Sequence, residues 1–157
     1  ISYKQKFIEY SELGLDYLRN IFRIIKKNTG GLLLIDYGYM DTKMRNTLQA
    51  TSNHKIANIL NNIGNVDITH NLNFDFLRKY TEQVVDLKCK LTTQKKFLLN
   101  MGIKQRAEIL SKNQNFLKKA DIFYRLNRLI DEKQMGNLFK VMLISNKENN
   151  FKIGFKN

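Results

Sequence analysis

The stretch GGLLLIDYGYMD, residues 30–41, decides the fold of this chain. A short apolar run that is bounded by glycines and ends at an acid is typical of a strand buried on both faces, as in parallel sheets. We therefore predict a strand over 32–35. Ligands of open α/β sheets bind outside the carboxyl ends of the strands, so Asp36 and Tyr37 are candidate site residues. The alternative, in which Asp36 caps the following loop and Tyr37 packs, is equally compatible with their position.

An amphipathic helix is predicted immediately before this strand, over residues 11–27. Its apolar side chains recur at spacings of three and four residues. Ser11 is a suitable N-cap, and Lys26 and Lys27 stand where the helix dipole is negative. A helix followed by a short loop and a buried strand is half of a βαβ unit, so the pattern predicts an α/β fold.

The rest of the chain continues this alternation of helices and strands. No Pro-rich or Ser-rich linker and no internal repeat divides the 157 residues. We therefore expect a single α/β unit over residues 1–157, with three or four strands and about five helices. The expected helices cover 54–64, a segment from 73, a segment from 93 to about 110 with a kink at Gly102, and 115–134, and the expected strands cover 85–91 and 138–145.

Basic residues outnumber acidic ones, 27 to 14, which gives a formal net charge of +13. Such a charge attracts nucleic acid, anionic lipid or an acidic partner. The lysines are scattered in pairs without a run of five, and this favours a solvated surface over a nucleic-acid footprint. No stretch approaches eighteen apolar residues, so no membrane span is expected. The single Cys89 lies in a run of alternating apolar residues and is predicted to be a structural thiol.

A second candidate site lies in VDITHNLNF, residues 66–74. Asp67 and His70 are three residues apart, and the acid could orient the imidazole for proton transfer or substrate binding. A turn-capping Asp67 and a surface His70 are the favoured alternative. There is no GxSxG nucleophile motif, no set of residues at metal-ligand spacing, and no glycine-rich phosphate loop after a strand. We therefore predict no metal site and no cofactor-cradling loop in this chain.

Several motifs, taken together, resemble the MidA family of S-adenosylmethionine-dependent methyltransferases. The mitochondrial members of that family are protein arginine methyltransferases that assist the assembly of respiratory complex I. In one respect the sequence departs from the family pattern, because Leu72-Asn73-Phe74 stands where the family has Val-Asp-Phe and a carboxylate is lost. The motifs follow the family's order: DYGY (36–39), TLQA (47–50), VDITH (66–70), TQKKFLLNMGIKQR (93–106) and MGNLFKV (135–141).

The resemblance implies a Rossmann-like fold of the class I methyltransferase type, with a mixed sheet, added helices and an antiparallel last strand. It implies that Asp36, Tyr37, Asp67 and His70 line the substrate side of the cleft. A carboxylate there could hold a guanidinium by paired hydrogen bonds. The resemblance covers the family's C-terminal half only. We therefore expect the S-adenosylmethionine site to lie mostly in an N-terminal half, supplied by the same or a separate polypeptide.

The function implied is the C-terminal portion of a methyltransferase that modifies protein arginine and is linked to complex I assembly when full length. The expected partner is a protein substrate, with a respiratory complex I subunit as the candidate. The expected location is the cytoplasm for a bacterial protein or the mitochondrial matrix for a eukaryotic one. Two alternatives stay open: a basic nucleic-acid-binding module without enzymatic activity, and an inactive gene remnant.

Overall fold

Strand β1 (Gly31–Tyr39) is the element around which the fold is built. The computed structural model describes residues 8–53, 55–60 and 63–155. In this part of the chain β1 belongs to a four-stranded sheet of order β5-β1-β7-β6. β5 is parallel to β1, whereas β7 is antiparallel to both of its neighbours, which confirms a mixed sheet with an antiparallel last strand. The other strands are β5 (Leu72–Asn73), β6 (Lys88–Thr93) and β7 (Phe139–Ser145).

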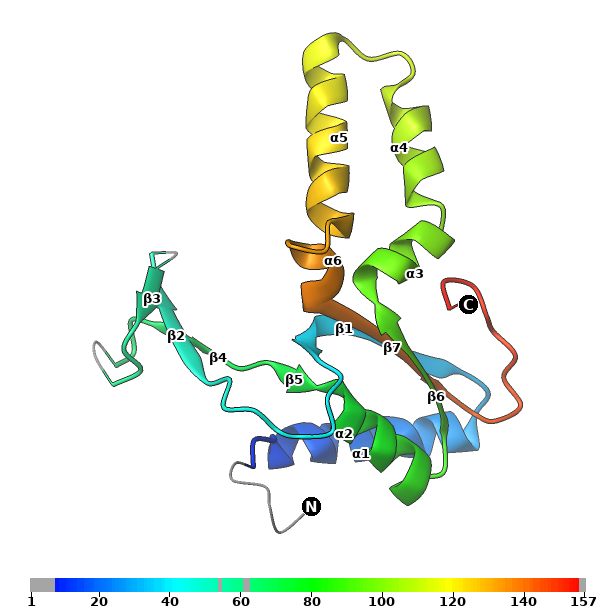
Figure 1. Cartoon of the computed structure of the whole chain (residues 1–157). Helices are drawn as coiled ribbons and strands as arrows, with labels where there is room; N and C mark the ends of the chain where they lie inside the picture. The colour runs from blue at the N-terminus through cyan, green and yellow to red at the C-terminus, as the bar shows by residue number, and fades with distance from the viewer. Residues whose placement is uncertain (1–7, 54, 61–62, 156–157) are drawn as a thin grey trace.

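The core lies between this sheet and the helices below it in Figure 1. The predicted N-terminal helix is confirmed as α1 (Glu12–Lys27), and the Ser11 hydroxyl caps it by accepting from the Gly14 amide at 3.0 Å. Beside it lie α2 (Phe74–Lys79) and a turn of π-helix, η1 (Tyr80–Val84). The buried residues that make the core are Phe22, Ile25, Phe74, Leu87, Met142 and Ile144.

β1 is buried on one face only, and here the structure differs from the sequence-based prediction. Leu32 and Leu34 pack against the core, whereas Leu33 and Ile35 on the other face are 46% and 50% exposed. The edge of β1 away from β7 is also open over most of its length. Among the described residues, β5 pairs with β1 only at Gly38 and Tyr39. An apolar face and a backbone edge are therefore left uncovered together.

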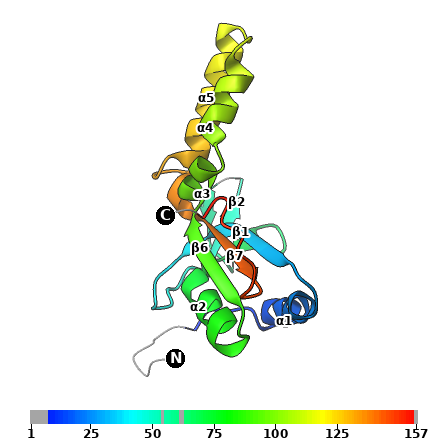
Figure 2. The same cartoon turned by 90° about the vertical axis from the view of Figure 1, so that its right-hand side faces the viewer.

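Four helices connect β6 to β7: α3 (Gln94–Asn100), α4 (Ile103–Ser111), α5 (Phe116–Ile130) and α6 (Met135–Leu138). The predicted break at Gly102 is confirmed, because this residue adopts φ +83°, a left-handed conformation that costs glycine little. The prediction of one helix over 115–134 is wrong at its end, since α5 stops at Ile130. Helices α4 and α5 form a hairpin that projects away from the sheet (Figures 1 and 2).

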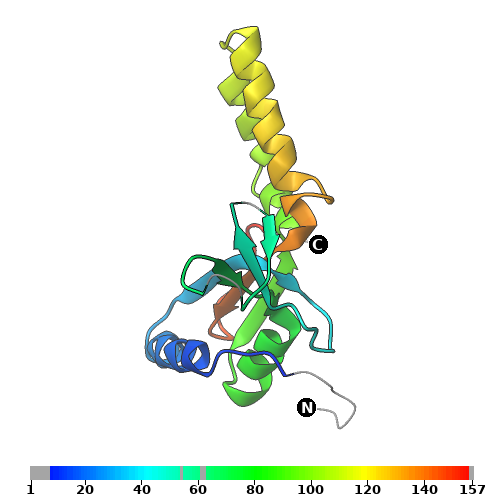
Figure 3. The ribbon, with the colours of Figure 1, turned by 90° about the vertical axis from the view of Figure 1, so that its left-hand side faces the viewer.

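A second, three-stranded sheet stands beside the main one, and Figure 3 faces it. It comprises β2 (Gln49–Ser52), β3 (Lys55–Ala57) and β4 (Asp67–Thr69). The predicted helix over 54–64 is therefore wrong, although residues 54, 61 and 62 lie outside the described part. The spacing of its apolar residues was misleading because Ile56 and Ile63 are exposed and have no core to cover.

Cys89 packs against the core as a structural thiol. Burial raises its pKa to about 12, and the nearby Glu82 carboxylate adds to the shift. At neutral pH the sulfur is therefore protonated and a poor nucleophile.

Asp75 ties the start of α2 to its next turn. Its carboxylate is buried and accepts from the Arg78 guanidinium at 2.6 Å and the Lys79 ammonium at 2.8 Å. Burial, the largest single influence, acts to raise the pKa of Asp75. The hydrogen bonds and charges of Lys79 and Arg78 together outweigh it, so the pKa lies below its ordinary value.

We predict that Asp75→Asn lowers the free energy of unfolding by about 1–2 kcal/mol at pH 7. Because the folded-state pKa is depressed, the contribution is present above about pH 4 and lost as pH falls through the folded value. Urea unfolding from pH 7 down to the acid transition measures it. The free energy of unfolding of Asp75→Asn should decrease less between pH 7 and the acid transition than that of the wild type. The variant Asp121→Asn, at an exposed carboxylate, should show the same decrease as the wild type. Identical pH profiles for wild type and Asp75→Asn would contradict this role.

Candidate functional site

Asp36 lies inside β1, three residues before the strand ends at Tyr39, and not after the strand as the sequence predicted. It is therefore in the half of β1 nearer to the carboxyl end, outside which ligands bind in open α/β sheets. Its side chain is half-buried, and one carboxylate oxygen accepts from the Tyr37 amide at 2.8 Å. A carboxylate has about four acceptor positions, so the local bond leaves capacity for a ligand. Because the strand continues to Tyr39, this bond lies within β1 and does not cap a loop. The role of Asp36 as a site residue stays a prediction.

Lys140 is the neighbour of Asp36 across the β1–β7 pair. Its ammonium is buried and donates to the carbonyl oxygens of Gly38 at 2.8 Å, of Leu138 at 3.3 Å and of Asn137. Burial lowers the pKa of this lysine. The signal in the sequence that could have pointed to this residue is a lone lysine in the apolar stretch LFKVMLIS, residues 138–145. Lys140 fixes the backbone beside Asp36 and places a positive charge at the end of the strand.

Gly38 lets β5 and α2 approach the end of β1. A Cβ at this position would lie 2.2 Å from the Leu72 carbonyl oxygen and 2.9 Å from the Phe74 ring. Contacts this short are not tolerated, so a side chain would push β5 away from β1. The glycine of the DYGY motif is therefore explained by packing.

Tyr37 lies on the face of the sheet opposite to Asp36, because successive strand residues alternate. Its ring meets the ring of Phe139 edge-on, with centroids 5.9 Å apart. The structure therefore places Tyr37 beside the start of β7, where the helical segment α3–α6 returns to the sheet. Tyr37 is next to Asp36 in the chain, but the two side chains point to opposite faces of the sheet.

His70 lies between β4 and β5 on the core side of β1. It lines a mostly apolar hollow of about 240 Å³ with Leu34 and Phe76. Leu34 and Asp36 share one face of β1, so the structure brings His70 to the side of the sheet that carries Asp36. The Nδ1 atom of His70 is buried and makes no hydrogen bond among the described residues. It can therefore serve a ligand or a proton at this position.

Asp67 is exposed on β4, where it pairs with Thr51 of β2. Three residues of extended chain place Asp67 about 10 Å from His70 along the backbone. An odd spacing also directs the two side chains to opposite faces. The structure does not bring Asp67 and His70 together as an acid–imidazole pair.

A hydrogen-bonded relay that the sequence analysis did not identify holds the segment around His70. The Thr47 hydroxyl donates to a Glu9 carboxylate oxygen at 2.6 Å and accepts from the Asn71 amide at 2.9 Å. It joins the segment before α1, the loop after β1 and the connection from β4 to β5. The TLQA motif was the signal that could have pointed to this role for its threonine.

Asn73 explains the departure from the family's Val-Asp-Phe pattern. Its side-chain oxygen accepts from the Phe76 amide at 3.0 Å and caps α2. Asn and Asp are about equally good N-caps. The lost carboxylate therefore corresponds to a capping position, and its loss does not by itself weaken the site.

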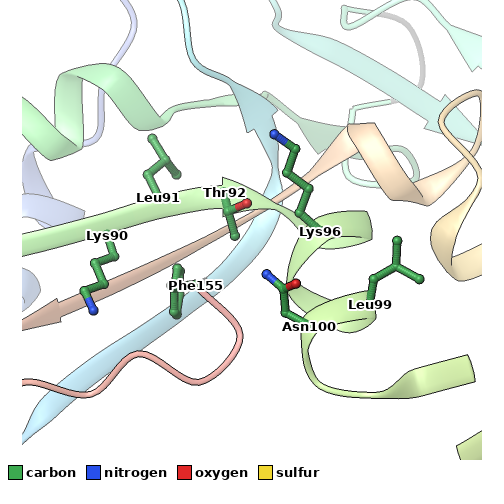
Figure 4. Close-up of a pocket in the computed structure, with 7 residues that line it drawn as sticks. All are labelled: Lys90, Leu91, Thr92, Lys96, Leu99, Asn100 and Phe155. Carbon is green, nitrogen blue, oxygen red and sulfur yellow. The ribbon is translucent and has the colours of Figure 1, made fainter. Parts of the chain in front are cut away.

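A second hollow, of about 610 Å³, lies between β6, α3 and the C-terminal segment (Figure 4). It is lined by Lys90, Lys96, Asn100 and Phe155 among others. Figure 4 shows the two ammonium groups pointing in different directions, and that of Lys90 donates to the Phe151 carbonyl at 2.5 Å. The lysines do not converge on one ligand position.

Residues 2–93 match the family described as "Putative S-adenosyl-L-methionine-dependent methyltransferase". The chain belongs to this family. The relatives include the mitochondrial protein arginine methyltransferase NDUFAF7 of Danio rerio, 32% identical over 78% of this chain and 28% of its own length. The Homo sapiens protein of the same name is 31% identical over 71% of this chain and 25% of its own length.

Two solved structures from Burkholderia thailandensis confirm the fold. One matches 93% of this chain and 40% of its own chain, with a TM-score of 0.75 and 25% identity. The other, described as a likely methyl transferase bound to S-adenosyl-homocysteine, has a TM-score of 0.74 and 24% identity over similar shares. The chain thus spans about a quarter of the curated relatives and two fifths of these structures. The resemblance to the MidA-type methyltransferases and the Rossmann-like fold class are confirmed.

The residues described here do not fit the methyltransferase cofactor as a whole. His70 lines two hollows: one of about 240 Å³ is smaller than the roughly 300 Å³ at which drug-sized ligand pockets begin, and the other, of about 370 Å³, is only a little larger. The larger hollow carries the ammonium groups of Lys90 and Lys96, which repel a cationic sulfonium. The Gly30–Gly31 pair lies at the start of β1, the end opposite to Asp36.

We predict that Lys140→Met lowers the free energy of unfolding by about 1–3 kcal/mol, because three carbonyl oxygens lose a charged donor. Chemical denaturation measures the loss. The exposed Lys43→Met is the matched control and should change stability by less than about 0.5 kcal/mol. A Lys140→Met variant as stable as the control would show that the ammonium does not hold this strand end.

Proposed function

We propose that this chain forms the substrate-side part of an S-adenosylmethionine-dependent protein arginine methyltransferase. The observation that carries the proposal is the half-buried Asp36 in the half of β1 nearer to the carboxyl end, with acceptor capacity beyond its bond to the Tyr37 amide. A carboxylate there can hold a guanidinium by two parallel hydrogen bonds, which fix its orientation as well as its position. The printed names of the relatives support a protein arginine as the substrate.

His70 and Asp67 have different places in this proposal. His70 lies on the same side of β1 as Asp36, and its Nδ1 atom has no hydrogen-bond partner among the residues that the structure describes, so it is available to orient the substrate or accept a proton. Tyr37 supports the end of the strand through Phe139. Asp67 lies on the exposed small sheet, where it can contact a protein substrate outside the cleft.

The cofactor, in this proposal, is held mostly by a further part of the fold that pairs with the open edge of β1. Leu33 and Ile35, half exposed beside that edge, are the apolar surface that such a part would bury. The greater length of the relatives supports a further part of this kind. The names of the relatives support a mitochondrial location for a eukaryotic protein, and the cytoplasm is proposed for a bacterial one. The resemblance to the MidA family extends the proposal to a substrate among respiratory complex I subunits.

A chimera tests the proposal. The segment of the Danio rerio relative that precedes its match is joined to this chain, and S-adenosylmethionine binding is measured by calorimetry. We expect little or no binding to the chain alone and clear binding to the chimera. Tight binding to the chain alone would contradict the division of the site.

Asp36→Asn in the chimera tests the role of the carboxylate. Methyl transfer to protein arginine should fall on the order of a hundredfold, because the guanidinium loses its alignment, while cofactor affinity and thermal stability stay near wild type. Asp86→Asn is the matched control, since Asp86 lies near the other end of the sheet and pairs with Lys147. Equal losses of activity and stability in Asp36→Asn would assign the residue a structural role instead.

A further inference from the structure

The hairpin of α4 and α5 carries apolar side chains that nothing in the described chain covers. None of the 15 residues of α5 is buried, although more than half of them are apolar or aromatic. Helices of folded proteins normally bury an apolar stripe. An exposed apolar surface on a projecting element therefore indicates an interaction site.

The exposed apolar residues concentrate at the tip of the hairpin. Phe116 and Leu117, at the start of α5, are 82% and 76% exposed, and Ile109 and Leu110 at the end of α4 are exposed as well. Figures 1 and 2 both show this tip at the far end of the molecule from α1 and α2. With 15 residues at 1.5 Å each, α5 holds the tip about 22 Å beyond its own C-terminal end, which adjoins the sheet.

Positive charge surrounds this apolar tip. Residues 109–120 contain Lys112, Lys118 and Lys119, all exposed, and no acidic residue. Two acids flank this segment: Asp121 is paired with Arg125 at 2.8 Å, whereas the exposed Glu108 adjoins Ile109 and offsets part of the charge of the lysines. The tip thus combines large apolar side chains at its end with ammonium groups within about one helical turn.

We propose that the tip of the α4–α5 hairpin is a peripheral membrane anchor that binds an anionic lipid surface. Phe116 and Leu117 insert among the upper acyl chains, and Lys118 and Lys119 lie at the level of the headgroup phosphates. Apolar insertion combined with basic residues is the pair of signals that holds proteins at membrane interfaces. Tyr124, exposed further down α5, has the amphipathic ring that favours the same interface.

The lysines around the apolar tip favour an anionic lipid surface as its occupant. The hollows described above are lined by residues of the body, so in the described part of the chain they offer no groove on the hairpin to a partner segment. The tip is a convex end that can enter a fluid interface without a matching cavity. Of the helices in the described part of the chain, none has the length and apolar character to span a bilayer.

A single tryptophan tests the insertion directly, because the chain contains none. Phe116→Trp should give emission that shifts to the blue, and is quenched by brominated lipid, on vesicles of phosphatidylcholine with phosphatidylglycerol. Ile56→Trp, on the small sheet and 88% exposed, is the matched control and should not respond. An unchanged spectrum for Phe116→Trp, or equal responses from the two variants, would overturn the proposal.

Vesicle co-sedimentation separates the contributions of the apolar residues and the lysines. Phe116→Ser with Leu117→Ser should weaken partitioning on the order of a hundredfold, and Lys118→Gln with Lys119→Gln by roughly thirtyfold at low salt. Circular dichroism checks that each variant is folded.

Two controls make the outcome decisive. Lys26→Gln with Lys27→Gln removes the same charge from the end of α1 and should leave binding nearly unchanged. Vesicles of phosphatidylcholine alone should bind the wild type weakly. Equal losses from the α1 lysine pair and the tip lysine pair would mean that net charge alone causes binding, which overturns the assignment. No binding of the wild type to anionic vesicles at low salt would also overturn it. These measurements need no methyltransferase activity, so they stand apart from the proposed function.

Discussion

The antiparallel pairing of β1 with β7 is the constraint on which the rest of the structure depends. The pairing runs without a break from Gly31 opposite Ser145 to Tyr37 opposite Phe139. It joins segments more than 100 residues apart, and Val141, Met142 and Ile144 of β7 are fully buried. This register sets Lys140 beside Asp36 and brings the end of the helical segment α3–α6 close to the carboxyl-terminal half of β1. The same strand pairing therefore positions both the candidate site and the α4–α5 hairpin.

The sequence predicted correctly the helix ends that are fixed by a capping side chain or by a glycine in the helix itself. Ser11 caps α1 as expected, and Gly102 separates α3 from α4 at the predicted place. Thr92 and Thr93 were both candidate caps for the helix that follows them, and the structure assigns that role to Thr93. The predicted helix over 54–64 failed for a physical reason. Its apolar spacing suited a helix, but β2 offers backbone pairing to residues 55–57 and no core faces Ile56. Tertiary pairing decided the structure of that segment.

Candidate site residues could be predicted only where the apolar pattern of the sequence indicates a strand and therefore a position in the sheet. Asp36 was singled out because an acid after an apolar run is expected at the ligand-binding edge of an α/β sheet. The structure continues the strand for three more residues, to Tyr39, because Tyr37 pairs with β7 and Gly38 and Tyr39 pair with β5. The spacing of Asp67 and His70 was misleading because their segment is extended, and side chains three apart then face opposite ways. Lys140 bonds to the Gly38 carbonyl, 102 residues away, and Thr47 bonds to the Asn71 amide, 24 residues away. No local sequence pattern indicates contacts between residues so far apart in the chain.

The proposed function requires that the cofactor-binding part of the fold completes the open edge of β1, which β5 pairs only at Gly38 and Tyr39 among the described residues. Hydrogen–deuterium exchange measures it most directly, by following the amides of residues 31–37 that point away from β7. In the chain alone these amides should exchange quickly. In the chimera with the Danio rerio segment, the account predicts protection comparable to that of the amides facing β7. Fast exchange of these amides in a chimera that binds S-adenosylmethionine and transfers methyl groups would contradict the claim.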